Sequence, residues 1–322
     1  MSSTDCTDVL HSLERQLSVL ADQVEQTKIL AAQSVVREFR NLKSSIPLVQ
    51  VEFRVFSQFG DDGIIQYIVN RLDLPNAEHN FIEFGVEDYR EANTRFLLLN
   101  DNWSGLVMDG SEHHVSCIRS EQIYWRHDLT ALARFITREN INSIIHEAGF
   151  GGRIGILSID VDGNDYWIWE AITAVDPTVV IVEYNGIFGS REALTIPYQP
   201  DFVRQNAHYS YLYWGTSLQA LCHLAARKGY TWIGCNSAGN NAYFVRNEYA
   251  DLFHHPTLPD DFIAAKFREG RDEQGHLNYI GQGKGLVLIR DLPVWDVVRN
   301  ENRLVGDCDG GTPNGSAVPA DY

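Results

Sequence analysis

The sequence predicts an α/β protein with a mostly parallel sheet of seven strands, helices on both faces of the sheet, and a helical extension at the amino terminus. From Val51 onward, short apolar runs rich in β-forming residues alternate with helix-like stretches, which is the pattern of βα units. Two later apolar runs are joined by a turn of Asn, Ser and Gly, which predicts an antiparallel hairpin that closes the sheet. Before Val51 the apolar residues instead recur at three- and four-residue steps, as in a helix that packs on another helix.

Composition limits the partners and the compartment. Of the 322 residues, 44% are hydrophobic, which is enough for one sizeable core. The net charge of -17 repels phosphate backbones and anionic membranes, so we expect neither nucleic acid nor a membrane as partner. The five cysteines form no C-x-x-C pair, and the amino terminus is polar rather than a basic and apolar leader. We therefore expect a cytoplasmic protein with reduced thiols.

The first fifty residues differ from the rest of the chain. Their apolar side chains repeat with the spacing of a seam between two helices, at Leu10, Leu13, Leu17, Leu20 and Val24. Because the repeat covers only about two heptads, a dimerising helix and a helix folded back on its own domain both remain open. We expect residues 1–50 to form an oligomerisation segment, and the protein to be a homodimer or a higher homo-oligomer.

The predicted elements of the main domain lie within residues 51–304. The strands span residues 80–86, 104–109, 122–127, 153–160 and 178–184, followed by the hairpin strands 231–235 and 241–246. The helices span residues 62–72, 91–99, 129–139, 165–174 and 216–228. Beyond residue 304 the composition turns to Gly, Asp, Pro and Ser, so we expect residues 305–322 to be a disordered tail.

Polar residues lie at the predicted strand ends, where ligands of open parallel sheets bind. The first strand carries Glu83 and then Gly85, a residue that lets backbone approach a ligand. Asp109 ends the second strand, where an acid can accept both hydroxyls of a ribose, and Asp128 follows the third, where it suits an adenine amino group. A G-x-G-x-x-G fingerprint is absent, which disfavours a nicotinamide enzyme. Each acid alone is equally well explained as a helix N-cap, but together they favour a ligand site.

Longer motifs follow one another in a characteristic order. They read S-Q-F-G-D-D-G-I-I at 57–65, E-F-G-V at 83–86, N-T-R-F-L-L at 93–98, I-D-V-D-G-N-D at 159–165 and G-Y-x-x-I-G-C-N-S-A-G-x-N-A-Y-F-V at 229–245. Over residues 56–247 the chain thereby resembles the class I S-adenosylmethionine-dependent methyltransferases, and within them the FkbM-like branch. It departs from the wider superfamily after Gly85, where Val86-Glu87-Asp88-Tyr89 replaces small residues.

The resemblance implies a Rossmann-like fold and S-adenosylmethionine as the cofactor. By position, Glu83 and Gly85 would hold the methionine moiety, Asp109 the ribose and Asp128 the adenine. The further cofactor-binding residues that it implies are Asn93, Gly110, Ser111 and Asp160.

A second group of polar residues follows the fourth and fifth strands. Several carboxylates in one place need a counter-ion, and oxygen donors without Cys or His suit Mg²⁺ or the sulfonium of the cofactor. Similarity to sugar-modifying methyltransferases implies that Asp160, Glu183 and Asn185 would hold the metal. For the general base we expect Asp160 or Asp162, with His208 as a second candidate. In the alternative, residues 162–165 only form a turn and the N-cap of the next helix.

These observations predict an S-adenosylmethionine-dependent O-methyltransferase that acts on a hydroxyl of a small molecule, such as a sugar or a glycosylated natural product. One alternative is another use of the same cofactor, such as transfer of its aminocarboxypropyl arm or a cyclisation. The other is a non-catalytic scaffold that assembles through the amino-terminal helix.

Overall fold

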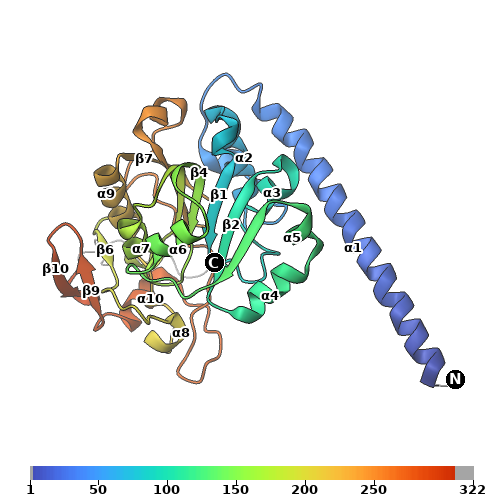
Figure 1. Ribbon diagram of the computed structural model, residues 1–322. Helices are drawn as coiled ribbons and strands as arrows, with labels where there is room; N and C mark the ends of the chain where they lie inside the picture. Colours follow the sequence, from blue (N-terminus) through green and yellow to red (C-terminus); the bar gives the residue numbers. More distant parts are fainter. Residues whose placement is uncertain (1–2, 309–322) are drawn as a thin grey trace.

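The computed structural model describes residues 3–308, which surround one central sheet (Figure 1). The sheet has seven strands in the order β3-β2-β1-β4-β5-β8-β7. Their bounds are β1 Asn80–Phe84, β2 Ser104–Asp109, β3 Leu129–Ala133, β4 Gly152–Ile159, β5 Val175–Glu183, β7 Tyr230–Cys235 and β8 Asn241–Arg246. The first five strands are parallel, while β8 runs antiparallel to β5 and β7 antiparallel to β8. The predicted Rossmann-like sheet and its closing hairpin are confirmed.

Helices cover both faces of the sheet because successive strand residues point to opposite sides. One core cluster joins the sheet to α2 (Asp61–Leu72), α3 (Arg95–Asp101), α4 (Glu112–Ser120) and α5 (Gln122–Arg126). The other joins it to α6 (Ile141–Glu147), α7 (Asp165–Ala171) and α9 (Leu218–Lys228). Within β1 the alternation is direct, since Phe81 belongs to the first cluster and Ile82 to the second. Strand β1 pairs with both β2 and β4, so the chain order reverses between β1 and β4.

The third strand corrects the sequence prediction. Residues 122–127, predicted as a strand, form the short helix α5, and the predicted helix 129–139 instead begins with strand β3. Strand β3 pairs in register with β2, from Gly105 opposite Leu129 to Asp109 opposite Ala133. Pairing with a neighbouring strand outweighs the helical propensity of Leu and Ala in this segment.

A smaller layer lies beside the main sheet. It contains a three-stranded sheet of order β10-β9-β6, formed by β6 Leu194–Thr195, β9 Pro293–Asp296 and β10 Glu301–Leu304. The helices α8 (Arg204–Ala207) and α10 (Gln282–Leu288) accompany it. Short 3-10 turns lie at Leu48–Gln50, Asn76–Glu78, Gly186–Phe188, Asn247–Leu252 and Val305–Asp307. Of the expected tail, Val305–Asp307 form that last turn, in which Val305 is buried; Cys308 follows it, and residues 309–322 lie outside the described residues.

Helix α1 (Ser3–Phe39) is the extension that the sequence predicts, and it projects from the body along most of its length (Figure 1). Its carboxyl-terminal part packs on the body through Ala32, Val36 and Phe39, all buried. Lys28 donates to the carbonyl of Val55, and Gln33 donates to the Asn100 side chain at 2.9 Å. Among residues 3–308, no helix combines the length and the apolar character needed to cross a membrane.

Candidate functional site

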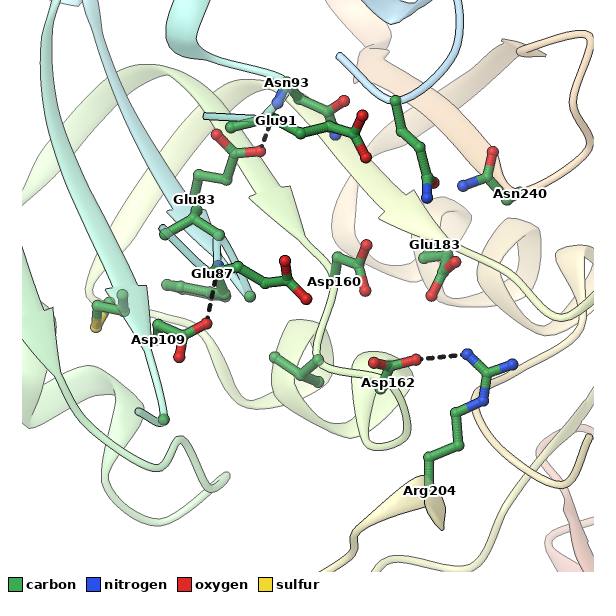
Figure 2. A pocket seen from close by; sticks show the side chains of 18 of the residues that line it. Glu83, Glu87, Glu91, Asn93, Asp109, Asp160, Asp162, Glu183, Arg204 and Asn240 are labelled. Carbon is green, nitrogen blue, oxygen red and sulfur yellow. Dashed lines mark hydrogen bonds and ion pairs between the residues drawn. The ribbon is translucent and has the colours of Figure 1, made fainter. Parts of the chain in front are cut away.

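A cavity of about 730 Å³ opens at the carboxyl ends of the parallel strands, beside the point where the strand order reverses. Its walls include residues that follow β1, β2, β3, β4 and β5, as well as two more distant segments near Arg204 and Phe267. Figure 2 shows acidic side chains entering it from several of these strand ends. This is the location that the rule for open parallel sheets predicts, and the size suits a ligand of a few tens of atoms.

Glu83 lies at the end of β1 and organises the start of α3. Its Oε1 accepts from the backbone N–H of Asn93 at 2.9 Å, and its Oε2 accepts from the backbone N–H of Thr94 at 3.0 Å and from the Thr94 hydroxyl. Burial raises the pKa of Glu83 to about 7 in spite of these bonds. Asn93 also donates to Ser158 at 3.1 Å, so the pair connects the ends of β1 and β4.

The turn after β1 passes very close to β4. Gly85 has a φ of +70°, and a Cβ built on it would lie 1.8 Å from the carbonyl oxygen of Asp160. A side chain is therefore excluded here both by conformation and by space. Glu87, two residues later, also has a positive φ, and its side chain enters the cavity (Figure 2).

Asp109 holds that turn in place. Its Oδ2 accepts from the backbone N–H of Glu87 at 2.9 Å, and its Oδ1 accepts from the backbone N–H of Ser111 at 2.8 Å and contacts His114 Nδ1 at 3.1 Å. Since each carboxylate oxygen can accept two hydrogen bonds, Oδ2 retains one acceptor position. Gly110 lines the cavity, whereas Ser111 caps α4 by accepting from the N–H of His114.

The expectation for Asp128 is wrong. Asp128 immediately precedes β3, whereas the cavity lies at the carboxyl ends of the strands, so its exposed side chain is at the opposite edge of the sheet. The error follows from the misassigned third strand. At the true carboxyl end of β3, the cavity wall is formed by Arg134, Phe135 and Ile136, and the Phe135 ring is half exposed. An aromatic face is available there for stacking.

Three carboxylates converge after β4 and β5. Asp160, Asp162 and Glu183 each place one oxygen within 4.8 Å of the others (Figure 2). Burial raises the pKa of Asp160 well above its usual range, and the nearby charges of Asp162 and Asp165 raise it further. Burial and the charge of Asp160 do the same to the pKa of Glu183. Glu183 Oε2 has no hydrogen-bond partner among residues 3–308, so this cluster can accept a proton or a cation.

Asn185 does not belong to this cluster, which corrects the predicted metal ligands. Its Oδ1 accepts from the N–H of Ile187 at 3.0 Å, and its Nδ2 donates to the carbonyls of Leu212 and Trp214, both at 3.0 Å. The side chain is buried and shapes the backbone beyond β5. Asp162 takes the place in the cluster that was assigned to Asn185.

The turn after β4 contains both residues that face the cavity and a residue that only builds the turn. Asp165 accepts from the backbone N–H groups of Val161 at 2.8 Å and Gly163 at 3.0 Å, so it builds the turn before α7, and burial raises its pKa to about 6. Asn164 is buried and lines the cavity, and its Oδ1 has no partner in the described part of the chain. Asp165 thus stabilises the turn, while Asp160, Asp162 and Asn164 face the cavity.

His208 is separated from the cavity, which corrects its place as a second candidate base. It lies outside the cavity lining, and its Nδ1 is 2.7 Å from the hydroxyl of Ser210. Burial lowers its pKa. The ring is thus engaged in local structure and out of reach of a ligand between Asp109 and Glu183.

Two distant segments complete the cavity on the side away from β2. Arg204 donates to Asp162 Oδ1 at 2.8 Å, forms an ion pair with Glu269 and stacks on Trp214 at 4.6 Å (Figure 2). Beside Glu269, the Phe267 ring stacks on Phe59 with centroids 5.8 Å apart. The ion pair and the ring pair fasten residues 267–269 to the cavity mouth.

Several cavity residues were missed by the sequence analysis. They come from loops or from segments far along the chain, and they are Glu87, Glu91, Arg134, Phe135, Arg204, Phe267 and Glu269. Glu87 alone had a sequence signal, because it lies two residues after the strand-end glycine. The others are brought in by tertiary packing, which a strand-end pattern does not encode.

Sequence comparison offers no assignment, since no protein-family profile and no curated protein matches the chain. Solved structures with a similar arrangement include three proteins of low sequence identity. The N-terminal domain of EvdMO1 with SAH (S-adenosylhomocysteine) bound has 10% identity and a TM-score of 0.37, covering 66% of this chain and 94% of that one. An O-methyltransferase from Bacillus cereus in complex with SAH has 14% identity and a TM-score of 0.36, covering 68% and 91%.

The third is the CurJ carbon methyltransferase, with 12% identity and a TM-score of 0.38, covering 72% of this chain and 69% of that one. These likenesses are too distant to transfer a function. Function has to be inferred from the residues of this cavity.

Proposed function

We propose that this protein is an S-adenosylmethionine-dependent O-methyltransferase of the FkbM-like branch. The observation that carries the proposal is the convergence of Gly85, Asp109 and Asp160 on one cavity beside the reversal of strand order. Gly85 allows the backbone to approach a ligand closely, and Asp109 supplies a carboxylate that can accept hydrogen bonds. The Phe135 ring beyond β3 adds an aromatic face, so these features follow one another in the order that an adenosyl group needs.

The residues present fit this cofactor. Asp109 Oδ2 retains an acceptor position for a ribose hydroxyl, and the Glu87 side chain supplies a further carboxylate to the cavity. Phe135 offers a half-exposed ring for the adenine in place of Asp128. The acidic lining from Glu87 to Glu183 complements the positive charges of an ammonium and a sulfonium group.

The motifs that carry the resemblance to the FkbM-like branch meet beside this cavity. Asp61, from the motif at 57–65, accepts from Asn236 and Asn241 at 3.0 Å and from Tyr243, all in the motif at 229–245. The same two motifs contribute Gln58 and Asn240 to the cavity lining. The contact between the two motifs supports a shared role in the part of the cavity that would bind the methyl acceptor.

For the acceptor we propose a hydroxyl of a sugar or of a glycosylated natural product. The acceptor side combines aromatic rings, Phe202 and Phe267, with the amide side chains of Asn164 and Asn240. Rings stack on the apolar face of a sugar, and amides bond to its hydroxyls. The unpartnered Asn164 Oδ1 would accept a hydrogen bond from such a hydroxyl.

The chemistry requires little covalent help from the protein. S-adenosylmethionine supplies a methyl group on a sulfonium, which is already a strong electrophile. The protein aligns the acceptor oxygen and removes its proton. Asp160 is better placed for this than Asp162, because Arg204 occupies Asp162, whereas burial favours proton uptake by Asp160.

We further propose that a divalent cation such as Mg²⁺ can be held by Asp160, Asp162 and Glu183. Three oxygens within 4.8 Å of one another, one of them on the unpartnered side of buried Glu183, suit a hard ion that prefers oxygen ligands. Bound there, the ion would lower the pKa of an acceptor hydroxyl. Calorimetric titration of the protein with MgCl₂ should give binding heat that Glu183→Gln removes; equal heats from both proteins would contradict this ligand set.

The cofactor assignment is tested by calorimetry with S-adenosylhomocysteine. Binding is expected, and Asp109→Ala should weaken it by about 1.5–3 kcal/mol, the typical worth of a hydrogen bond to a charged group. Asp128→Ala is the matched control, because this exposed acid lies at the other edge of the sheet and should leave affinity unchanged. No binding heat at high ligand concentration would refute the cofactor assignment.

The reaction type is tested by mass analysis of the products from S-adenosylmethionine and a panel of sugars. Release of S-adenosylhomocysteine with an acceptor heavier by one methylene supports O-methyl transfer. Release of methylthioadenosine would instead indicate transfer of the aminocarboxypropyl arm or a cyclisation.

A further inference from the structure

Helix α1 carries an apolar stripe that its own body leaves uncovered. The stripe consists of Leu10, Leu13, Leu17, Leu20 and Val24, here called the α1 seam, and their exposed fractions run from 49% to 65%. Figure 1 shows this part of α1 extending away from the rest of the chain. A contiguous apolar stripe of this kind on a protein surface marks a place that a partner covers.

The docking of α1 on the body does not use the seam. At about 100° of turn per residue, the buried contacts Ala32, Val36 and Phe39 lie about 90° around the helix axis from the mean direction of the seam. The two apolar faces are therefore separate, and the seam stays open while the helix is docked. Glu25, which follows the seam, already contacts the body through Arg95 at 3.9 Å.

We propose that the α1 seam pairs with the α1 seam of a second copy of this chain. Alternating three- and four-residue spacing is the geometry by which two helices interlock side chains along a common line. Such a line fits another helix with the same spacing, and each copy of the chain presents one. This inference is independent of the proposed enzymatic function.

The charges beside the seam agree with self-association. Between Leu10 and Val24 the charged side chains are Glu14, Arg15 and Asp22, a net charge of -1, whereas the whole chain carries -17. The seam therefore does not select a basic partner, and two copies meet there with little repulsion. The residues beside the seam on one flank, Gln16 and Gln23, are uncharged.

The area sets the expected strength of the pair. Ten seam side chains, five from each copy, would bury on the order of 500–1,000 Å² in total, judged from the transfer free energy of a half-exposed Leu. That is below the roughly 1,200–2,000 Å² of stable interfaces and in the range of transient ones, so a weak, reversible and concentration-dependent dimer is expected.

Sedimentation equilibrium of the full-length protein tests the proposal. Between about 1 and 200 µM, where an interface of this size associates, the average mass should rise from the 36.5 kDa of one chain toward twice that value. Leu17→Glu, which places a charge in the middle of the seam at a side chain that is 65% exposed, should hold the mass at that of one chain over the whole range. Because Leu17 does not contact the core, the fold should persist, as an unchanged melting temperature would verify.

Val19→Glu is the matched control. Val19 is 56% exposed on the same part of α1 but lies about 140° around the axis from the seam. It should dimerise like the unmodified protein. A wild-type protein that remains a single chain at the highest concentration would overturn the proposal and point to a different occupant. Equal loss of dimer in Leu17→Glu and Val19→Glu would overturn it as well, because the contact would then not depend on the seam.

Discussion

The two halves of the cavity use their acids differently. On the side of β1 and β2, Glu83 and Asp109 accept backbone N–H groups and fix the loops around them. On the side of β4 and β5, Asp160 and Glu183 face each other and leave an oxygen without a partner. Like charges held together without donors are costly, and proteins retain such an arrangement where chemistry or a cation needs it. The first half therefore builds the site, and the second half is equipped to act in it.

The largest expected effect comes from removing a proton acceptor in the half beside β4 and β5. Asp160→Asn keeps the shape of the side chain but cannot take up a proton, so kcat for methyl transfer should fall by about 10²–10⁴-fold. Affinity for S-adenosylhomocysteine should change little, and the melting temperature should not fall, since the variant relieves repulsion with Glu183. Steady-state kinetics beside calorimetry checks this. A loss confined to cofactor affinity would show that Asp160 helps to build the binding site, as Glu83 and Asp109 do, and does not take up the proton.

A side chain at Gly85 should disturb both halves at once. In Gly85→Ala the new Cβ meets the Asp160 carbonyl and the positive φ is strained, which together should lower the free energy of unfolding by about 2–5 kcal/mol. Gly149→Ala is the control, because its φ is +84° but no atom lies within 4 Å of the added Cβ. Urea denaturation of both variants separates strain from collision. Similar losses in the two would mean that the close approach contributes nothing.

Glu83 should reveal the cost of a buried acid in the first half. Its folded-state pKa of about 7 lies above the usual 4.5, so the contribution of Glu83 to stability is full below pH 4.5 and is lost as the pH rises toward 7. Glu83→Gln cannot ionise, so its stability relative to the wild type should improve by about 3 kcal/mol over that window. Urea denaturation of both proteins at several pH values measures this. A difference that does not vary with pH would argue against the raised pKa.

The smallest effect is expected at Asp162. This carboxylate is half exposed, and its pair with Arg204 is open to solvent on the side of Asp162, so Asp162→Asn should change the free energy of unfolding by less than about 1 kcal/mol. Thermal denaturation at low and high salt gives the value. A loss of several kcal/mol would show that the pair is a structural support of the cavity mouth.

The sequence was sufficient for most of the sheet. Strands β1, β2, β4 and β5 and the hairpin were predicted within a few residues, because each is a short, mostly apolar run that ends at a polar or glycine-containing turn. The third strand was wrong, since Ile123-Tyr124-Trp125 looks like a strand and Leu129–Ala133 like a helix until β2 is beside them. The secondary structure of such short segments is determined by the elements that pack beside them.

For the site, the rule that ligands bind at strand ends correctly placed Glu83, Asp109, Asp160 and Glu183 at one cavity. The prediction for Asp128 was wrong because the third strand was assigned to the wrong residues. The prediction that Asn185 is a metal ligand failed for another reason: nearby backbone groups bond to both the oxygen and the nitrogen of its side-chain amide. Arg204 and Phe267 could not be foreseen, because packing between sequence-distant segments brings them to the cavity.

Arg204 joins two parts of the cavity with one guanidinium group: Asp162 in the turn after β4, and Glu269 in residues 267–269. A molecule that binds Asp162 has to compete with Arg204, which can keep its ion pair with Glu269. Selectivity in this protein would then depend on which acceptors can compete with an arginine, as well as on which ones fit.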